Sequence, residues 1–195
     1  FMATVVDTTG LILSNCQRAA ELIRSFKQVA VDRTSDERRW FDLGATIRET
    51  LASLGPNLRQ AGHQITVACP EGLRMNSHPG ALSQVLGNFV MNSLIHAFPP
   101  GQSGHLAIQA ERLDDGRRVR VRYADDGCGI AAEHRGHVFD PFFTTRRGSG
   151  GSGLGLHIVY NLVTGTLGGT VALEPAAAGT TFVLVLPLVA GEPAA

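Results

Sequence analysis

The sequence is poor in the features that mark several specialised classes of protein. Only 3 of its 195 residues are cysteine, and Cys16, Cys69 and Cys128 show no metal-binding spacing, which argues against a disulfide scaffold or a zinc site and favours a reducing compartment. The chain has no signal peptide and no run of about eighteen apolar residues that would span a membrane. Basic and acidic residues balance at 17 each, so the zero net charge gives no support for nucleic-acid binding.

These absences predict a cytoplasmic, globular segment that binds neither nucleic acid nor a membrane. About 160 residues follow a polar stretch near position 35, which is enough for one well-buried domain. The sequence leaves open whether a longer parent protein is anchored in a membrane.

Glycine, by contrast, is abundant, and one cluster of it leads directly into an apolar helix. The chain has 23 glycines, and the run GGSGLG at 150–155 is followed by LHIV at 156–159. Glycine lets backbone N–H groups approach a ligand closely, and a helix start offers unpaired donors and partial positive charge. The run therefore suggests a phosphate or anion site. Taken alone, it is equally typical of an ordinary connection.

A second pattern is a strand that ends in acidic residues and a glycine turn. The alternation at Val119–Tyr123 predicts a strand, and Asp125, Gly127 and Gly129 follow it. A carboxylate fixed beside such a turn suits a planar ligand with an exocyclic amine, which would donate to the carboxylate. The plain alternative is a common Asp-Gly turn.

A third pattern is a helix that carries two asparagines on one face. Asn88 and Asn92 stand at positions i and i+4 of an apolar helical repeat. Asparagine is a mediocre helix former, and its amide oxygen suits Mg²⁺, which prefers oxygen ligands and is often held jointly with substrate phosphates. Taken alone, the pair is more typical of asparagines whose amides are satisfied within the fold.

Along the chain the asparagine helix comes first, the strand that ends at Asp125 second and the glycine run last, and Phe139–Phe143 lies between the second and the third. Together these four stretches resemble a known family. The chain is similar to the catalytic ATP-binding domain of two-component sensor histidine kinases, in the larger group that includes gyrase, MutL and the heat-shock chaperone ATPases. Asn88–Phe98 resembles the N box, Asp125–Gly129 the first glycine box, Phe139–Phe143 the F box and Gly151–Gly155 the second glycine box. The resemblance covers roughly residues 10 to 188. It implies an α+β class, a two-layer α/β sandwich with a mixed sheet, known as the Bergerat ATP-binding fold.

The resemblance also implies roles for individual residues. Asn88 and Asn92 match the positions that bind Mg²⁺ and the ATP phosphates, and Asp125 matches the carboxylate that accepts from the adenine amino group. Arg146 falls in the ATP lid, where it could reach phosphate oxygens or be a solvated charge. Many histidine kinases have a lysine where this chain has Ile95, and the nearby polar group here is His96, which could face the nucleotide phosphates or cap the helix surface. The further nucleotide-binding positions are Gly127, Gly129, Gly151, Gly153, Leu154, Gly155 and Thr180.

One position bears on the type of reaction. Hydrolytic members of the group carry a glutamate where this chain has Asn88, and an amide cannot act as a general base. The resemblance therefore implies transfer of the ATP γ-phosphoryl group to a histidine on a helix hairpin, for relay to an aspartate of a response-regulator receiver domain. The alternatives are a hydrolytic ATPase of the same fold, a serine kinase of this fold, and a non-catalytic nucleotide-binding or dimer-control module.

The chain is expected to divide into four parts. Residues 1–34 would be the trailing helix of an incomplete dimerisation and phosphotransfer hairpin, because apolar residues from Ile12 to Ala30 recur at alternating spacings of four and three, as in a coiled coil. A single amphipathic helix packed on its own domain is the alternative. A linker at 35–40, the catalytic domain at 41–189 and a loose tail at 190–195 would follow. A homodimer would form through the N-terminal helix.

The acceptor histidine is expected to lie outside this chain. None of its seven histidines has the helical His-Glu or His-Asp context with a downstream proline that phosphoacceptor helices usually show. The fragment should therefore bind Mg-ATP without phosphorylating itself.

Local patterns predict the remaining order of the catalytic domain. Helices are expected at 43–58, 79–98 and 154–164, and strands at 65–68, 105–112, 119–124, 170–174 and 181–186. Asp114–Gly116 is a hairpin-turn signal. In the family, a stretch such as Trp40–Leu43 can pair with its dimer mate as a strand. The mixture of elements predicts a mixed sheet with helices on one face.

Overall fold

The computed structural model describes residues 37–99, 101–114, 116–145, 152–176 and 178–191. The predicted N-terminal helix at 1–34 lies outside the described residues, as do Arg146, Gly151 and most of the predicted tail. No helix in the described ranges is long and apolar enough to cross a membrane.

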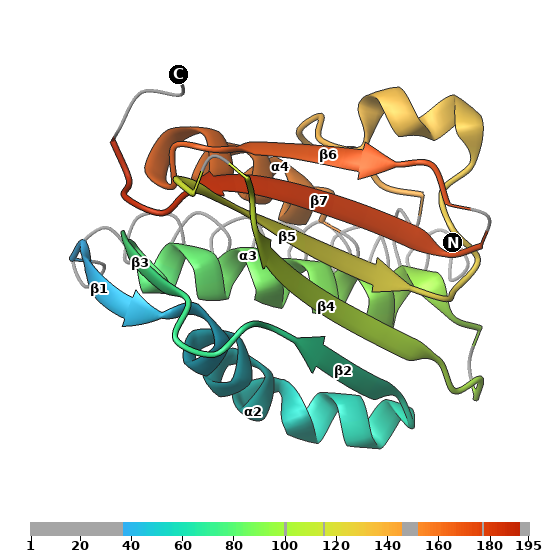
Figure 1. Cartoon of the computed structure of the whole chain (residues 1–195). Coiled ribbons are helices and arrows are strands. Elements are labelled where there is room, and N and C mark those ends of the chain that lie inside the picture. The colour runs from blue at the N-terminus through green and yellow to red at the C-terminus, as the bar shows by residue number, and fades with distance from the viewer. Residues whose placement is uncertain (1–36, 100, 115, 146–151, 177, 192–195) are drawn as a thin grey trace, which may run out of the picture.

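A five-stranded mixed sheet forms one layer of the domain (Figure 1). Its spatial order is β2-β4-β5-β7-β6, and β2 and β4 are parallel while the other neighbours are antiparallel. The strands are β2 (Gln64–Ala68), β4 (His105–Arg112), β5 (Arg118–Asp125), β6 (Thr170–Glu174) and β7 (Thr180–Pro187). All five strands were predicted from alternation and turn residues: β4 and β6 have the predicted bounds, and the other three extend one residue further at one or both ends.

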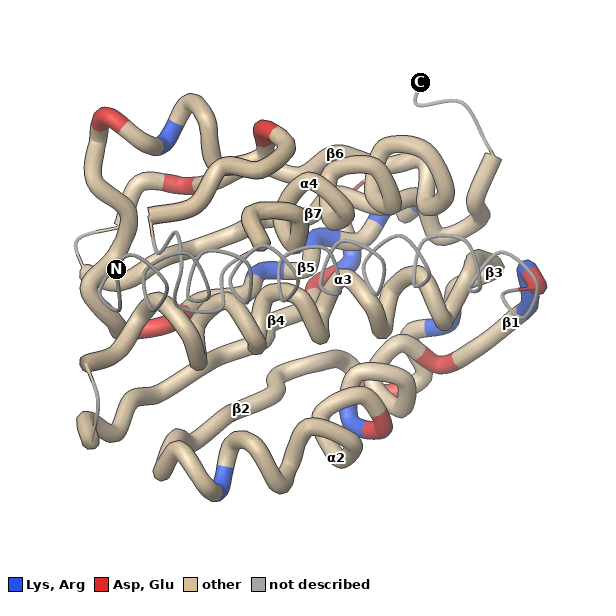
Figure 2. Tube along the Cα trace, turned by 180° about the vertical axis from the view of Figure 1, so that it is seen from behind, with Lys and Arg blue, Asp and Glu red and all other residues tan. Residues whose placement is uncertain are grey.

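Three helices form the second layer on one face of this sheet. They are α2 (Leu43–Ala61), α3 (Pro79–Asn92) and α4 (Gly155–Asn161). Figure 2, seen from behind, shows them side by side with α3 in the middle, and α3 contacts both of its neighbours. The two-layer arrangement confirms the predicted α/β sandwich.

Aromatic rings join the two layers at the centre of the core. Phe89 of α3 is fully buried and stacks on Phe182 of β7 at 4.7 Å between ring centroids and on Tyr123 of β5 at 5.3 Å. Large buried rings dominate core energetics, and offset stacking adds to the area that they bury. This packing fixes the distance between α3 and the strand that carries Asp125.

Two of the predicted helices change character before they end. The helix predicted at 79–98 is α-helical to Asn92 and then forms a π-helical turn, η1 (Ser93–Ala97), and α4 is followed by a second one, η3 (Leu162–Thr166). A π-helical turn accommodates an extra residue within a helix and is frequent at functional sites. The helix predicted at 79–98 is therefore present to Ala97, with its last turn in π geometry.

The beginning of the domain also differs from expectation. Strand β1 (Arg39–Asp42) pairs antiparallel with β3 (Arg74–Ser77), a strand that was not predicted. Arg39 and Trp40, which were assigned to the linker, are therefore part of a two-stranded sheet within the chain. In this structure the Trp40 stretch pairs with β3 of the same chain. Asp42 then caps α2, because its side chain accepts from the Ala45 backbone N–H at 2.7 Å.

Candidate nucleotide-binding site

The two asparagines of α3 face the start of α4. A side chain built on Gly155 would begin 3.3 Å from Asn88 Oδ1 and 3.5 Å from Asn92 Oδ1. Both amide oxygens therefore converge on one point, and the bare backbone of Gly155 leaves that point open. The Asn88 amide is held in this orientation because its Nδ2 donates to the Gln84 carbonyl at 3.0 Å.

The asparagine face is electrically neutral. Helix α3 contains no charged residue along its whole length, as Figure 2 shows by its uniform tan colour. The buried Asn92 Nδ2 has no hydrogen-bond partner among the described residues. A buried donor left unsatisfied is costly, so its presence beside two convergent oxygens fits a polar ligand at this place.

Asp125 stands at the end of β5 in a set of three hydrogen bonds. Its Oδ1 accepts from the backbone N–H groups of Gly127 and Thr180, each at 3.1 Å, and its Oδ2 accepts from the Ser93 hydroxyl at 2.6 Å. The residue is only 7% exposed. Burial of a carboxylate is costly without such partners, and here both oxygens are supplied.

A second hydroxyl extends this set into the core. Tyr123 donates from its hydroxyl to Ser93 Oγ at 2.8 Å, and burial raises the pKa of this phenol well above its ordinary value. Ser93 lies in η1, directly after Asn92, so it joins the asparagine face to the carboxylate. Neither hydroxyl was predicted as a site residue. The available signals were the place of Ser93 beside Asn92 and the i, i+2 spacing of Tyr123 and Asp125 on one face of a strand.

The first glycine turn packs closely on neighbouring backbone. A side chain on Gly127 would collide with the Ala97 carbonyl, which also accepts from the Cys128 N–H at 2.8 Å. Gly129 has φ of 73° and would place a side chain 2.8 Å from the Gly179 carbonyl. Only glycine fits both constraints, since a side chain would be strained and would clash.

The structure places the other predicted residues around these two centres. Gly153, with φ of 69°, packs against the backbone of Phe142, and Leu154 donates from its N–H to Ser152 Oγ at 3.3 Å. His96 is half-buried in η1, and its carbonyl accepts from the Cys128 thiol at 3.4 Å. Thr180 contacts Asp125 through its backbone N–H. The positions of Arg146 and Gly151 are outside the described residues.

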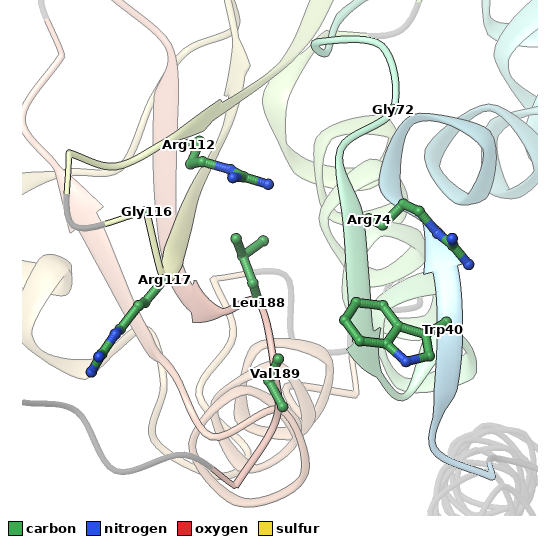
Figure 3. Close-up of a pocket in the computed structure, with 8 residues that line it drawn as sticks. All are labelled: Trp40, Gly72, Arg74, Arg112, Gly116, Arg117, Leu188 and Val189. Atoms are coloured by element: carbon green, nitrogen blue, oxygen red, sulfur yellow. The ribbon is translucent and has the colours of Figure 1, made fainter.

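A separate hollow of about 420 Å³ lies at the other end of the sheet (Figure 3). Strand β5 starts beside it and ends at Asp125, a run of eight residues or about 23 Å. Arg112 points into the hollow, whereas Arg117 points away from it. None of the predicted site residues is among its lining, which is Trp40, Gly72, Arg74, Arg112, Gly116, Arg117, Leu188 and Val189.

Comparison with known proteins identifies the family. Residues 77–190 match the model of the histidine kinase-, DNA gyrase B- and HSP90-like ATPases. The chain belongs to this family. The matched segment contains α3, η1, β5 and β7, which are the elements that carry Asn88, Asn92, Asp125 and the groups that hold Asp125.

Curated relatives are sensor kinases that are longer than this chain. It is 34% identical over 149 residues to the sensor histidine kinase ZraS of Klebsiella oxytoca, a match that covers 75% of this chain and 31% of ZraS. It is 30% identical over 178 residues to the sensor protein DegM of Bacillus sp. (strain B21-2), covering 91% of this chain and 45% of DegM. The chain thus spans less than half the length of these relatives.

Solved structures support the same assignment. The catalytic domain of the histidine kinase ThkA matches with a TM-score of 0.68 and 29% identity, covering 78% of this chain and 97% of that domain. A complex of ThkA with the response regulator TrrA matches with a TM-score of 0.65 and 26% identity, covering 87% of this chain and 48% of the matched chain. The resemblance to a histidine kinase ATP-binding domain is confirmed, within a chain of the α/β sandwich fold.

Proposed function

We propose that residues 41–189 are the ATP-binding catalytic domain of a sensor histidine kinase and that the domain holds Mg-ATP for transfer of the γ-phosphoryl group to a histidine. The observation that carries the proposal is the orientation of Asn88. Its Nδ2 is engaged by the Gln84 carbonyl, so its oxygen faces the open point at Gly155, and the amide cannot take a proton from water. The arrangement suits holding ATP until another nucleophile arrives.

Asp125 would define the adenine end of the site. Its carboxylate is fixed by Gly127, Thr180 and Ser93, and it would accept from the exocyclic amine of the base. Gly127 and Gly129 would let the ring lie against backbone, because glycine has no side chain to cover it. Neither position has room for a larger residue. The remaining predicted contacts, from His96, Gly153, Leu154 and Thr180 and from Arg146 and Gly151 of the lid, belong to this proposal.

Asn88 and Asn92 would define the phosphate end. Their convergent oxygens suit a hard cation, and Mg²⁺ is commonly held by few protein oxygens together with substrate phosphates. When bound, Mg²⁺ neutralises charge on the phosphates during transfer. The chain's own part is positioning: the neutral face of α3 keeps carboxylates away from the phosphates, and Gly155 leaves the space that they need.

The phosphoryl acceptor would be a histidine on a helix hairpin that is incomplete in this chain, and the next acceptor an aspartate of a response-regulator receiver domain. The matched complex of ThkA with its response regulator supports such a partner. Residues 1–34 would be the trailing hairpin helix, through which the protein would form a homodimer, and residues 35–40 the linker that leads into the domain. The segment would act in the cytoplasm without contacting the membrane and would not phosphorylate itself.

Calorimetric titration with a non-hydrolysable ATP analogue, with and without Mg²⁺, tests this proposal. The chain should bind in a Mg²⁺-dependent manner, and Asp125→Asn should abolish binding. An asparagine there would have to keep its oxygen toward Gly127 and Thr180, so its NH₂ group would face the donor amine of adenine. Absence of binding by the unsubstituted chain would support the non-catalytic alternative, and sustained phosphate release from ATP would support the hydrolytic one.

A further inference from the structure

The hydrogen bonds around Asp125 have a fixed direction. An ionised carboxylate can only accept, so the Ser93 hydroxyl must donate to it, and their separation of 2.6 Å is typical of a hydroxyl bound to a charged oxygen. Ser93 Oγ therefore has only lone pairs left for its other partner. Tyr123 fills that role as the donor at 2.8 Å, and both hydroxyl residues are almost completely buried.

Most of the positions at which Asp125 can accept a hydrogen bond are then occupied. A carboxylate offers about four positions for hydrogen-bond donors. Among the described residues, Gly127 and Thr180 occupy two of them on Oδ1, and Ser93 occupies one on Oδ2. One position on Oδ2 stays open, and it can take a donor but not an acceptor.

We propose that Ser93 and Tyr123 are positioning residues that make Asp125 selective for a 6-amino purine over a 6-oxo purine. This inference rests on the proposed function, in which Asp125 meets the base. The hydrogen bonds from Tyr123 to Ser93 and from Ser93 to Asp125 hold the carboxylate in one orientation and leave it one acceptor position. The amine of adenine can donate there, whereas the carbonyl of hypoxanthine would face a second acceptor without a proton between them.

Each hydroxyl contributes differently to this selectivity. Ser93 fixes the plane of the Asp125 carboxylate directly, so its loss lets Oδ2 turn away from the amine of adenine. Without a fixed direction at Oδ2, the carboxylate distinguishes a 6-amino from a 6-oxo group less sharply. Tyr123 acts through Ser93 by occupying its lone pair, and because burial raises the pKa of the phenol, Tyr123 remains a donor across the working pH range.

The test compares the affinities of non-hydrolysable ATP and ITP analogues at neutral pH. The two bases differ at the 6-position and at the adjoining N1 proton, so their ratio reports on the open position of Asp125. The variants are Ser93→Ala and Tyr123→Phe, with Ser93→Thr to restore the hydroxyl. Matched controls are Ser53→Ala, whose hydroxyl bonds within α2, and Tyr160→Phe, whose ring is 44% exposed.

In the unsubstituted chain and both controls the ratio should favour ATP to the same extent. Ser93→Ala should lower it about tenfold, as expected when a hydrogen bond to a charged group is lost. Tyr123→Phe, which removes one oxygen atom and keeps the ring packing, should lower the ratio by a smaller factor, and Ser93→Thr should restore it.

Two negative results are distinguishable. Binding of ATP with an unchanged ratio in Ser93→Ala and Tyr123→Phe would overturn this inference and leave the proposed function standing. Absence of binding to either nucleotide by the unsubstituted chain would overturn both. If Ser93→Ala does not fold, as judged by thermal unfolding, Tyr123→Phe decides the question by itself.

Discussion

Substitution of Gly155 by alanine should change stability and nucleotide affinity in opposite directions. The backbone of Gly155 is not left-handed, so an alanine can adopt it. A compatible Gly→Ala change stabilises a protein by about 0.4–1 kcal/mol because the unfolded chain loses freedom. For a domain of this size the melting temperature would rise by about 1–4 °C. The tight contact of the new methyl group with Asn88 would reduce this rise.

The same methyl group would occupy the point on which the asparagine oxygens converge. It would lie 3.3 Å from Asn88 Oδ1 and 3.5 Å from Asn92 Oδ1, so neither oxygen could contact Mg²⁺ or a phosphate there. Loss of one interaction with a charged group costs about 1.5–3 kcal/mol. Affinity for the Mg²⁺-bound ATP analogue should therefore fall between about tenfold and a hundredfold.

Gly87→Ala supplies the matched control for this experiment. Gly87 precedes Asn88 on α3, and a side chain there would meet nothing within 4 Å. It should raise the melting temperature in the same way but leave the affinity unchanged. Thermal unfolding and calorimetric titration of both variants give the two numbers. Equal affinity of Gly155→Ala and Gly87→Ala would refute the assignment of the asparagine oxygens to the phosphate end.

Three further outcomes follow from the core and the first glycine turn. Phe89→Ala removes the ring that stacks on Phe182 and should destabilise the domain by about 3–5 kcal/mol in urea unfolding, whereas an unchanged midpoint would contradict the packing. Tyr123 has a pKa raised above 10, the ordinary value, in the folded state, so its contribution to stability is fully present below pH 10 and is lost as the pH rises further. Tyr123→Phe should therefore reduce the alkaline loss of stability measured by urea unfolding. Gly129→Ala forces a side chain into φ of 73° beside the Gly179 carbonyl, and it should lower both the melting temperature and the affinity for the ATP analogue.

The predicted strands and helices depended on local spacing, and most of them are present for that reason. Alternation along β4 and β5 puts every second side chain on the core face, and the burial of Leu106, Ile108, Val119 and Val121 follows from it. Strand β3 lacks this signal, because Arg74–Ser77 contains one apolar residue among polar ones. It exists because its backbone pairs with β1, a partner more than thirty residues away that no local pattern indicates.

The π-helical turn could not be predicted either, although it shapes the site. Helical periodicity runs through Asn92 into Ser93–Ala97 without a break in residue type, and the proline at position 99 marks only the end. The wider turn brings the carbonyls of His96 and Ala97 to Cys128, so contacts with the first glycine turn accompany it. The choice between α and π geometry at Ser93–Ala97 thus depends on contacts with a segment distant in sequence.

The environment of Asp125 shows most clearly what spacing leaves undetermined. The motif places a carboxylate at the end of a strand, but its partners depend on the register of β5 against β7, which pairs Asp125 with Thr180. Because strand faces alternate, a slip of one residue would turn Asp125 and Tyr123 together to the opposite face. Their shared face is the core side, where a carboxylate is tolerated only with donors on both oxygens. The register that buries Phe182 against Phe89 is therefore the same register that supplies the Thr180 N–H to Asp125. The core and the site thus form through the same pairing of β5 with β7.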